Sequence, residues 1–110
     1  MLTRRERTEV LVESGPALAL ELAGLVEAAA PAEDIVPAHQ VLVTESRVRI
    51  GEADGLGVLM GTDAAHARAL AVIDAAYAMD PAPACLAELE RRVEEARAAM
   101  FERVAAQDAL

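Results

Sequence analysis

The sequence predicts an α+β domain, in which a small antiparallel β-hairpin or sheet packs against N-terminal and C-terminal helices. Residues 4–30 and 84–107 carry apolar side chains at helical spacing. Residues 40–62 instead alternate apolar and polar side chains, as half-buried strands do, and residues 63–78 return to the helical pattern. A chain of 110 residues suits one domain spanning 1–110, able to fold alone but with little margin.

The composition predicts a thin core and a protein partner. Apolar residues make up 55% of the chain, but aromatic residues are only 2% and alanine supplies much of the remainder. Alanine buries little area, so we expect apolar surface to be covered by a partner subunit or by self-association. The net charge of −9 and the lack of lysine argue against nucleic acid, whose phosphates require cations.

Other classes are disfavoured by what the chain lacks. A single cysteine, Cys85, excludes an internal disulfide framework. We find neither a signal peptide nor an apolar run near the roughly 20 residues that span a bilayer. We therefore expect a cytoplasmic protein without a membrane segment.

Two helices are predicted before the hairpin. Thr3 and Glu6 form a capping box for a helix that ends near Glu13. Ser14-Gly15-Pro16 interrupts it, and Pro16 suits the first position of the next helix. That helix should bury a stripe at helical spacing before Pro31 ends it, made of Leu18, Leu22, Leu25, Val26 and Ala29.

The hairpin begins with Val41 and Val43, followed by Val48 and Ile50. These pairs differ in parity, so we expect a bulge near Glu45-Ser46 to keep all four on one face. The Asp-Gly pair predicts a turn over residues 52–55 and a returning strand over residues 56–60. The Ile35-Val36 segment is a candidate additional strand.

The remaining helices follow a polar break at residues 61–63. Thr62 or Asp63 should cap a helix over residues 64–78. The last helix shows a heptad-like seam, with i,i+4 pairs Glu88–Arg92 and Arg91–Glu95 on its solvated side. The seam consists of Leu86, Leu89, Val93, Ala96 and Met100.

Candidate sites are few. An anion could bind at the helix N-terminus through Gly61, Thr62 and His66, although an ordinary N-cap by Asp63 competes with it. His66 otherwise suits a buried position, hydrogen-bonded to the sheet. Neither His39 nor His66 shows the ligand spacing of a zinc site, so we predict no metal and no cofactor.

Two pairs of residues are candidates for partner binding. Arg47 and Arg49 share the polar face of one strand and could meet an acidic partner, although a solvated strand face would also explain them. Leu89 and Val93 lie in the seam of the last helix and could meet a partner helix. No catalytic residue is predicted.

A family resemblance lies mainly between Arg47 and Ala76. Val48-Arg49-Ile50, Asp54-Gly55, the 57–60 strand, the 61–67 segment GTDAAHA and the 72–75 segment VIDA resemble the G subunit of the bacterial carbon–phosphorus lyase system. The opening Arg4-Arg5 and the leucine-rich helix also resemble that family's start. The family's glycine-rich segment and its C-terminal ending have no counterpart here, and Thr62 replaces its usual arginine.

The resemblance implies a non-catalytic accessory subunit of a phosphonate-metabolism complex. In that system the G subunit acts with the I subunit, which attaches a phosphonate to the ribose of a nucleoside triphosphate and displaces the base. The chain would then belong to a phosphonate ribosyl-triphosphate synthase complex. The alternative is a stand-alone homo-oligomeric domain that binds a small anion or nucleotide between Gly61 and His66.

Overall fold

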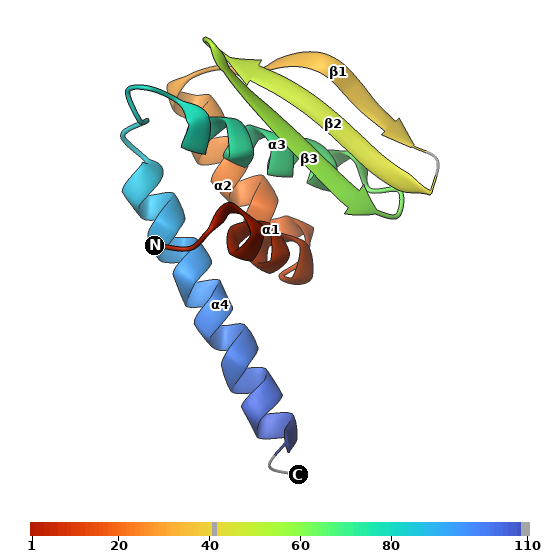
Figure 1. Ribbon diagram of the computed structural model, residues 1–110, viewed down its shortest axis with the longest axis vertical. Coiled ribbons are helices and arrows are strands. Elements are labelled where there is room, and N and C mark those ends of the chain that lie inside the picture. The colour runs from red at the N-terminus through yellow and green to blue at the C-terminus, as the bar shows by residue number, and fades with distance from the viewer. Residues whose placement is uncertain (41, 109–110) are drawn as a thin grey trace.

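The structure, a computed structural model, describes residues 1–40 and 42–108, with side chains described at 1–36 and 42–107. Val41, predicted to begin the hairpin, lies outside the described residues. The α+β prediction is confirmed (Figure 1). The elements follow the order α1 (Arg4–Glu13), α2 (Pro16–Ala29), β1 (Glu33–Gln40), β2 (Val43–Ile50), β3 (Ala53–Met60), α3 (Ala64–Ala78) and α4 (Leu86–Asp108).

The helix starts follow the local signals in the sequence. The Thr3 hydroxyl oxygen accepts from the Glu6 amide at 3.1 Å, and the Glu6 carboxylate accepts from the Thr3 amide at 3.0 Å. Pro16 begins α2 behind Gly15, whose φ of 83° reverses the chain. Asp63 caps α3, because its Oδ1 accepts from the His66 amide at 3.0 Å. All three starts agree with the predictions.

The buried stripe of α2 differs from the predicted one. Leu22 and Val26 are buried as expected, but Leu25 and Ala29 are exposed on the solvent side. Small residues replace them on the inner face, where Ala19 and Ala23 are buried. This is possible because α2 packs closely on α3, another alanine-rich helix, so small side chains fill the interface.

The sheet has the order β1-β2-β3 and is antiparallel throughout. The pairing of β2 with β3 runs without a break from Val43↔Met60 to Ile50↔Ala53. The turn is therefore Gly51-Glu52, with Gly51 at φ 61°. The predicted turn at Asp54-Gly55 is wrong, because both residues lie inside β3.

The predicted bulge near Glu45-Ser46 is also wrong. β2 keeps strict alternation, so Thr44 and Ser46 point inward with Val48 and Ile50, while Val43 points outward. The Thr44 hydroxyl donates to the Gly61 carbonyl at 2.6 Å, which lets one polar group enter the core. The irregularities lie instead in β1, between Asp34 and Val36 and between Val36 and His39.

Two glycines bring β3 against α3. A Cβ atom built on Gly57 would lie 2.0 Å from the Ala67 carbonyl oxygen. One built on Gly55 would lie 2.0 Å from the Ala71 carbonyl oxygen. A side chain at either position would push the helix away, so the close contact of strand and helix requires glycine here. Gly55 thus serves helix packing rather than the turn predicted for it.

The helices α2 and α3 lie on one side of the sheet, and the opposite face carries no helix among the described residues (Figure 1). α3 is buried along most of its length between the sheet and α2. Arg68 of α3 bonds Glu27 of α2 at 2.6 Å and Asp34 of β1 at 2.8 Å. α3 therefore connects the sheet to α2.

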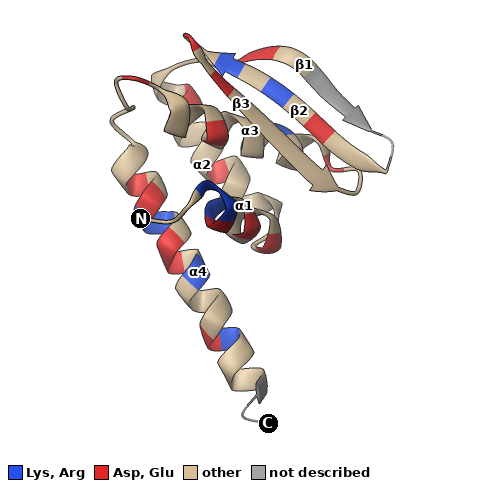
Figure 2. Cartoon of the chain, in the orientation of Figure 1, with Lys and Arg blue, Asp and Glu red and all other residues tan. Residues whose placement is uncertain are grey.

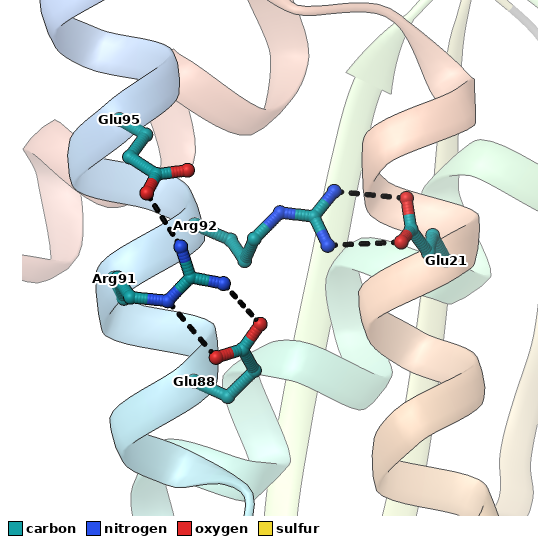
Figure 3. Close-up of polar contacts among 5 residues, drawn as sticks. All are labelled: Glu21, Glu88, Arg91, Arg92 and Glu95. Atoms are coloured by element: carbon teal, nitrogen blue, oxygen red, sulfur yellow. Dashed lines mark hydrogen bonds and ion pairs between the residues drawn. The ribbon is translucent and has the colours of Figure 1, made fainter.

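Polar contacts and a short apolar seam hold α4 against the other helices. Arg92 reaches Glu21 of α2 through two hydrogen bonds of 2.9 Å (Figure 3). The Glu88–Arg92 pair predicted from the sequence is therefore wrong, since Glu88 bonds Arg91 instead. The predicted Arg91–Glu95 pair is confirmed. The C-terminal end of α4 extends away from the other elements (Figure 1).

Candidate functional site

The Gly61–His66 segment is a helix cap whose polar groups serve the fold. The His66 ring is buried, and its Nε2 lies 3.0 Å from the Leu11 carbonyl oxygen of α1. A carbonyl only accepts, so Nε2 is the donor in this contact. The buried position agrees with the prediction, but the partner is a helix carbonyl rather than the sheet. Gly61 and Thr62 are exposed, so the His66 ring does not meet them at one surface.

Asp63 also disfavours anion binding at this helix N-terminus. Its carboxylate occupies the helix N-terminus by accepting from the His66 amide. That amide is one of the donors a bound phosphate would need, and the carboxylate repels a second anion. The geometry therefore gives the anion-binding alternative no support beyond the sequence pattern.

Arg47 and Arg49 lie on the exposed face of β2, as predicted. The Arg49 Nε donates to Asp54 Oδ1 on β3 at 2.8 Å, across a directly opposed pair. That hydrogen bond raises the pKa of Arg49 and lowers the pKa of Asp54. Arg47 has no ion pair within the described residues. It is the more available of the two cations for a partner.

The surface around Arg47, which we call the outer sheet face, combines apolar and charged residues. The strand pairing places Val36 beside Arg47 on one side and Leu56 on the other. Exposed apolar side chains are concentrated at the Val43–Met60 end of the face, where Met60 is 81% exposed. Charges of both signs follow one another along β2 (Figure 2). The face consists of Glu33, Val36, Val43, Glu45, Arg47, Arg49, Asp54, Leu56, Val58 and Met60.

Leu89 and Val93, predicted to contact a partner, are already covered by their own chain. Their exposed fractions are 0% and 1%. They belong to the hydrophobic core, together with residues of α1 and α2. This half of the predicted seam is therefore internal, and a partner could reach these residues only by displacing α4.

The outward part of α4 presents a different apolar surface, which we call the α4 tip. Phe101 is 58% exposed and Val104 is 53% exposed. The Arg97 guanidinium lies 4.9 Å from the centre of the Phe101 ring and bonds Glu6 of α1 at 2.9 Å. A groove of about 180 Å³ runs between α1 and this part of α4. Its lining residues are Glu6, Glu9, Val10, Arg97, Met100, Phe101 and Val104.

A polar network at Asp74 was not predicted from the sequence. Arg4 donates to both Asp74 carboxylate oxygens, at 2.9 and 2.7 Å, which raises the pKa of Arg4. Arg7 lies 3.7 Å from the same carboxylate, and the Leu56 amide donates to it at 3.0 Å. Arg4 and Asp74 are 70 positions apart, so no local pattern could reveal the pair. The sequence gives one indication that Asp74 has a structural partner, which is that this acidic residue lies among apolar residues in a predicted helix.

Tyr77 completes this network. The Arg7 guanidinium lies 3.6 Å from the centre of the Tyr77 ring, at the distance of a cation–π contact. Burial, followed by the nearby Glu90 carboxylate, raises the pKa of the Tyr77 phenol. A pocket of about 230 Å³ opens here, lined by Arg4, Arg7, Asp54, Asp74, Tyr77 and Ala78. Arg4 and Arg7 are engaged with Asp74, and Asp54 is engaged with Arg49 outside the pocket, so the pocket is a joint between α1, β3 and α3.

Within residues 1–36 and 42–107, no three His, Cys, Asp or Glu side chains gather where they could hold a metal ion. The His39 side chain lies outside the described part. No helix in the described ranges is both long and apolar enough to cross a membrane. No protein-family model matches the chain, and no curated protein matches it.

Proposed function

We propose that this chain is a non-catalytic interaction subunit of a phosphonate-metabolism complex of the carbon–phosphorus lyase type. The observation that carries the proposal is the role of the residues that resemble the G subunit of that system. Several of them lie at the joints of the fold, and others, such as Arg49 and Met60, lie on an open surface. On this proposal, the buried resemblance residues hold the fold together and the open surfaces contact the other subunits.

The resemblance residues meet across the chain in pairs. Arg4, from the opening segment, bonds Asp74 of the VIDA segment. His66, from the GTDAAHA segment, bonds the Leu11 carbonyl of the first helix. Gly55 and Gly57 allow β3 to touch α3. These contacts give the motifs one shared structural purpose, which is what the proposal expects of residues that build the fold of a subunit.

The surfaces left for partners are the outer sheet face and the α4 tip. Both combine exposed apolar side chains with charged ones, as protein contact sites do. In the proposed complex the α4 tip receives an apolar side chain of the I subunit in the groove beside Phe101. Such a complex would act in the cytoplasm, where its nucleoside triphosphate is found.

The test is co-elution with an I subunit of a phosphonate system. Mixed at micromolar concentration, the two purified proteins should migrate together in size-exclusion chromatography. Phe101→Asp should reduce co-elution strongly, because it places a charge in the groove. Glu102→Gln lies on the exposed side of the same helix turn and serves as the matched control.

Two outcomes would contradict the proposal. The wild-type chain could fail to bind any of several I subunits, which would remove the phosphonate function. Alternatively, binding could survive Phe101→Asp, which would keep the function but exclude the α4 tip as the docking surface. Unchanged circular dichroism of the variant shows that its fold is intact.

A further inference from the structure

We propose that two copies of this chain associate by stacking their outer sheet faces, with Glu45 of each copy opposite Arg47 of the other. The inference concerns this chain alone and does not depend on the phosphonate function. It rests on three features of the sheet: protected edges, an open face of sufficient size, and a charge pattern that complements itself.

Both sheet edges are poorly suited to pairing with another strand. On β3, the Leu56 amide is already bonded to Asp74 at 3.0 Å. On β1, two irregularities interrupt the register, and Pro37 supplies no amide hydrogen. Continuous pairing with a second sheet needs a regular row of free backbone groups, which neither edge offers. These interruptions favour association through the face of the sheet over pairing at its edges.

The outer sheet face is large enough for a weak dimer. Three strands of eight residues cover about 26 by 14 Å, or roughly 370 Å² of flat area per copy. The accessible area of protruding side chains exceeds this flat area. Stacking two copies covers about 740 Å² of flat area in total, which is the size of a weak and reversible contact rather than of a permanent interface. Val58, 45% exposed, and the half-buried Leu56 supply apolar area beside Glu45 and Arg47, at the centre of the face.

The charges select one arrangement of the two copies. Glu45 and Arg47 are both exposed and lie two positions apart on the same face of β2. A two-fold axis across the strands at Ser46 places each Glu45 opposite the other copy's Arg47. The register then also places Val58 opposite the other copy's Leu56. An axis along the strands would instead oppose Glu45 to Glu45, which like-charge repulsion disfavours.

Sheet twist makes these central residues decisive. Stacked sheets cross at about 30°, so their corners diverge while their centres remain in contact. Arg47 is well placed for this role because it has no ion pair within the described part of its own chain. Arg49, nearer the turn, is already bonded to Asp54 and remains at the margin.

The experiment is sedimentation velocity of the full chain from low to high micromolar concentration. The wild type should show a reversible monomer–dimer equilibrium. Glu45→Arg and Arg47→Glu should each weaken dimerisation at least tenfold, since each replaces two attractive contacts with two repulsive ones. The double variant, Glu45→Arg with Arg47→Glu, should restore it.

A mixture of the two single variants gives the sharper test. Each variant alone carries like charges at both positions, but the mixed dimer again opposes arginine to glutamate at both sites. The mixture should therefore dimerise where neither variant does. Phe101→Asp, on α4, should leave the equilibrium unchanged, and circular dichroism should show that all variants fold.

Three results would overturn the proposal. The first is a wild type that stays monomeric at every concentration, leaving the face for a different protein. The second is failure of both the double variant and the mixture to recover dimerisation. The third is loss of the dimer on Phe101→Asp with no effect of the β2 reversals, which would place the contact on α4.

Discussion

Replacing Gly57 with alanine sets two physical effects of opposite sign against each other. Glycine in a strand costs about 0.5–1 kcal/mol relative to alanine, because the unfolded chain loses more freedom on folding. Propensity alone therefore predicts that Gly57→Ala stabilises the protein. The structure predicts the reverse, since the new Cβ would lie 2.0 Å from the Ala67 carbonyl oxygen and 2.7 Å from the Ala71 nitrogen.

The steric effect should win. Both close atoms belong to the backbone of α3, so no side-chain rotation can relieve the clash. Relief requires α3 to move away from β3, yet α3 is packed against α2 on its other side. Overpacking of this kind typically costs about 1–3 kcal/mol and sometimes more. Subtracting the propensity gain leaves a net loss of at most about 2.5 kcal/mol, and we expect about 1–2 kcal/mol.

Urea unfolding followed by far-ultraviolet circular dichroism measures this directly. With a slope of about 1–2 kcal/mol per molar urea, the midpoint should fall by roughly 1 M. Gly24→Ala is the matched control, because a Cβ at Gly24 meets nothing within 4 Å and the residue lies in the exposed side of α2. That variant should gain about 0.5–1 kcal/mol. If Gly57→Ala gains stability as Gly24→Ala does, the close contact between β3 and α3 does not exist.

Three further predictions concern polar groups. Asp74→Asn should destabilise the protein by about 2–4 kcal/mol, because Arg7, whose side chain is only 8% exposed, would lose its carboxylate partner. The exposed Arg4 contributes less. A double-mutant cycle that combines Asp74→Asn with Arg7→Met should show strong coupling between the two residues. An equal loss on Asp74→Asn in the Arg7→Met background would refute this. Ser46→Ala should stabilise the protein by about 1 kcal/mol, measured by thermal unfolding, since the buried Ser46 hydroxyl has no hydrogen-bond partner among the described residues. A destabilised variant would show that the hydroxyl has a partner. Arg92 holds the pKa of Glu21 below its ordinary value of 4.5, so their contact contributes fully above that value and is lost as pH falls through the folded-state pKa. Glu21→Gln should remove that part of the acid dependence of the melting temperature, and an unchanged acid profile would contradict the assignment.

The helix boundaries could be predicted because their signals are local. A capping residue acts on amides within three positions, so Thr3, Pro16 and Asp63 each reveal a helix start. The predicted hairpin was correct in kind but wrong at its turn. An Asp-Gly pair suits a turn, but glycine also suits close helix contact, and only the three-dimensional position of α3 distinguishes the two uses of Gly55.

The inner face of β2 was mispredicted for a related reason. The spacing of the apolar residues predicts Val43 on the inner face, with a bulge near Glu45-Ser46 to place it there. In the structure, Thr44 can enter the core because Gly61, distant in sequence, provides a carbonyl acceptor. Which residues of a strand face the core thus depends on partners that lie far along the chain. The same limit hid the Asp74 network and made Leu89 and Val93 look available to a partner.

The position of the central elements has a consequence for how the protein opens. β2, β3 and α3 occupy one continuous segment, residues 43–78, whereas the outer helices attach through contacts between distant residues. Arg97–Glu6 and Arg92–Glu21 join residues 91 and 71 positions apart. Such contacts can release without unpairing the hairpin, so amide hydrogens of α4 should exchange with solvent through smaller openings than those of α3. Equal protection of α4 and α3 would contradict this. The chain would thus loosen from its C-terminal end while its centre stays folded.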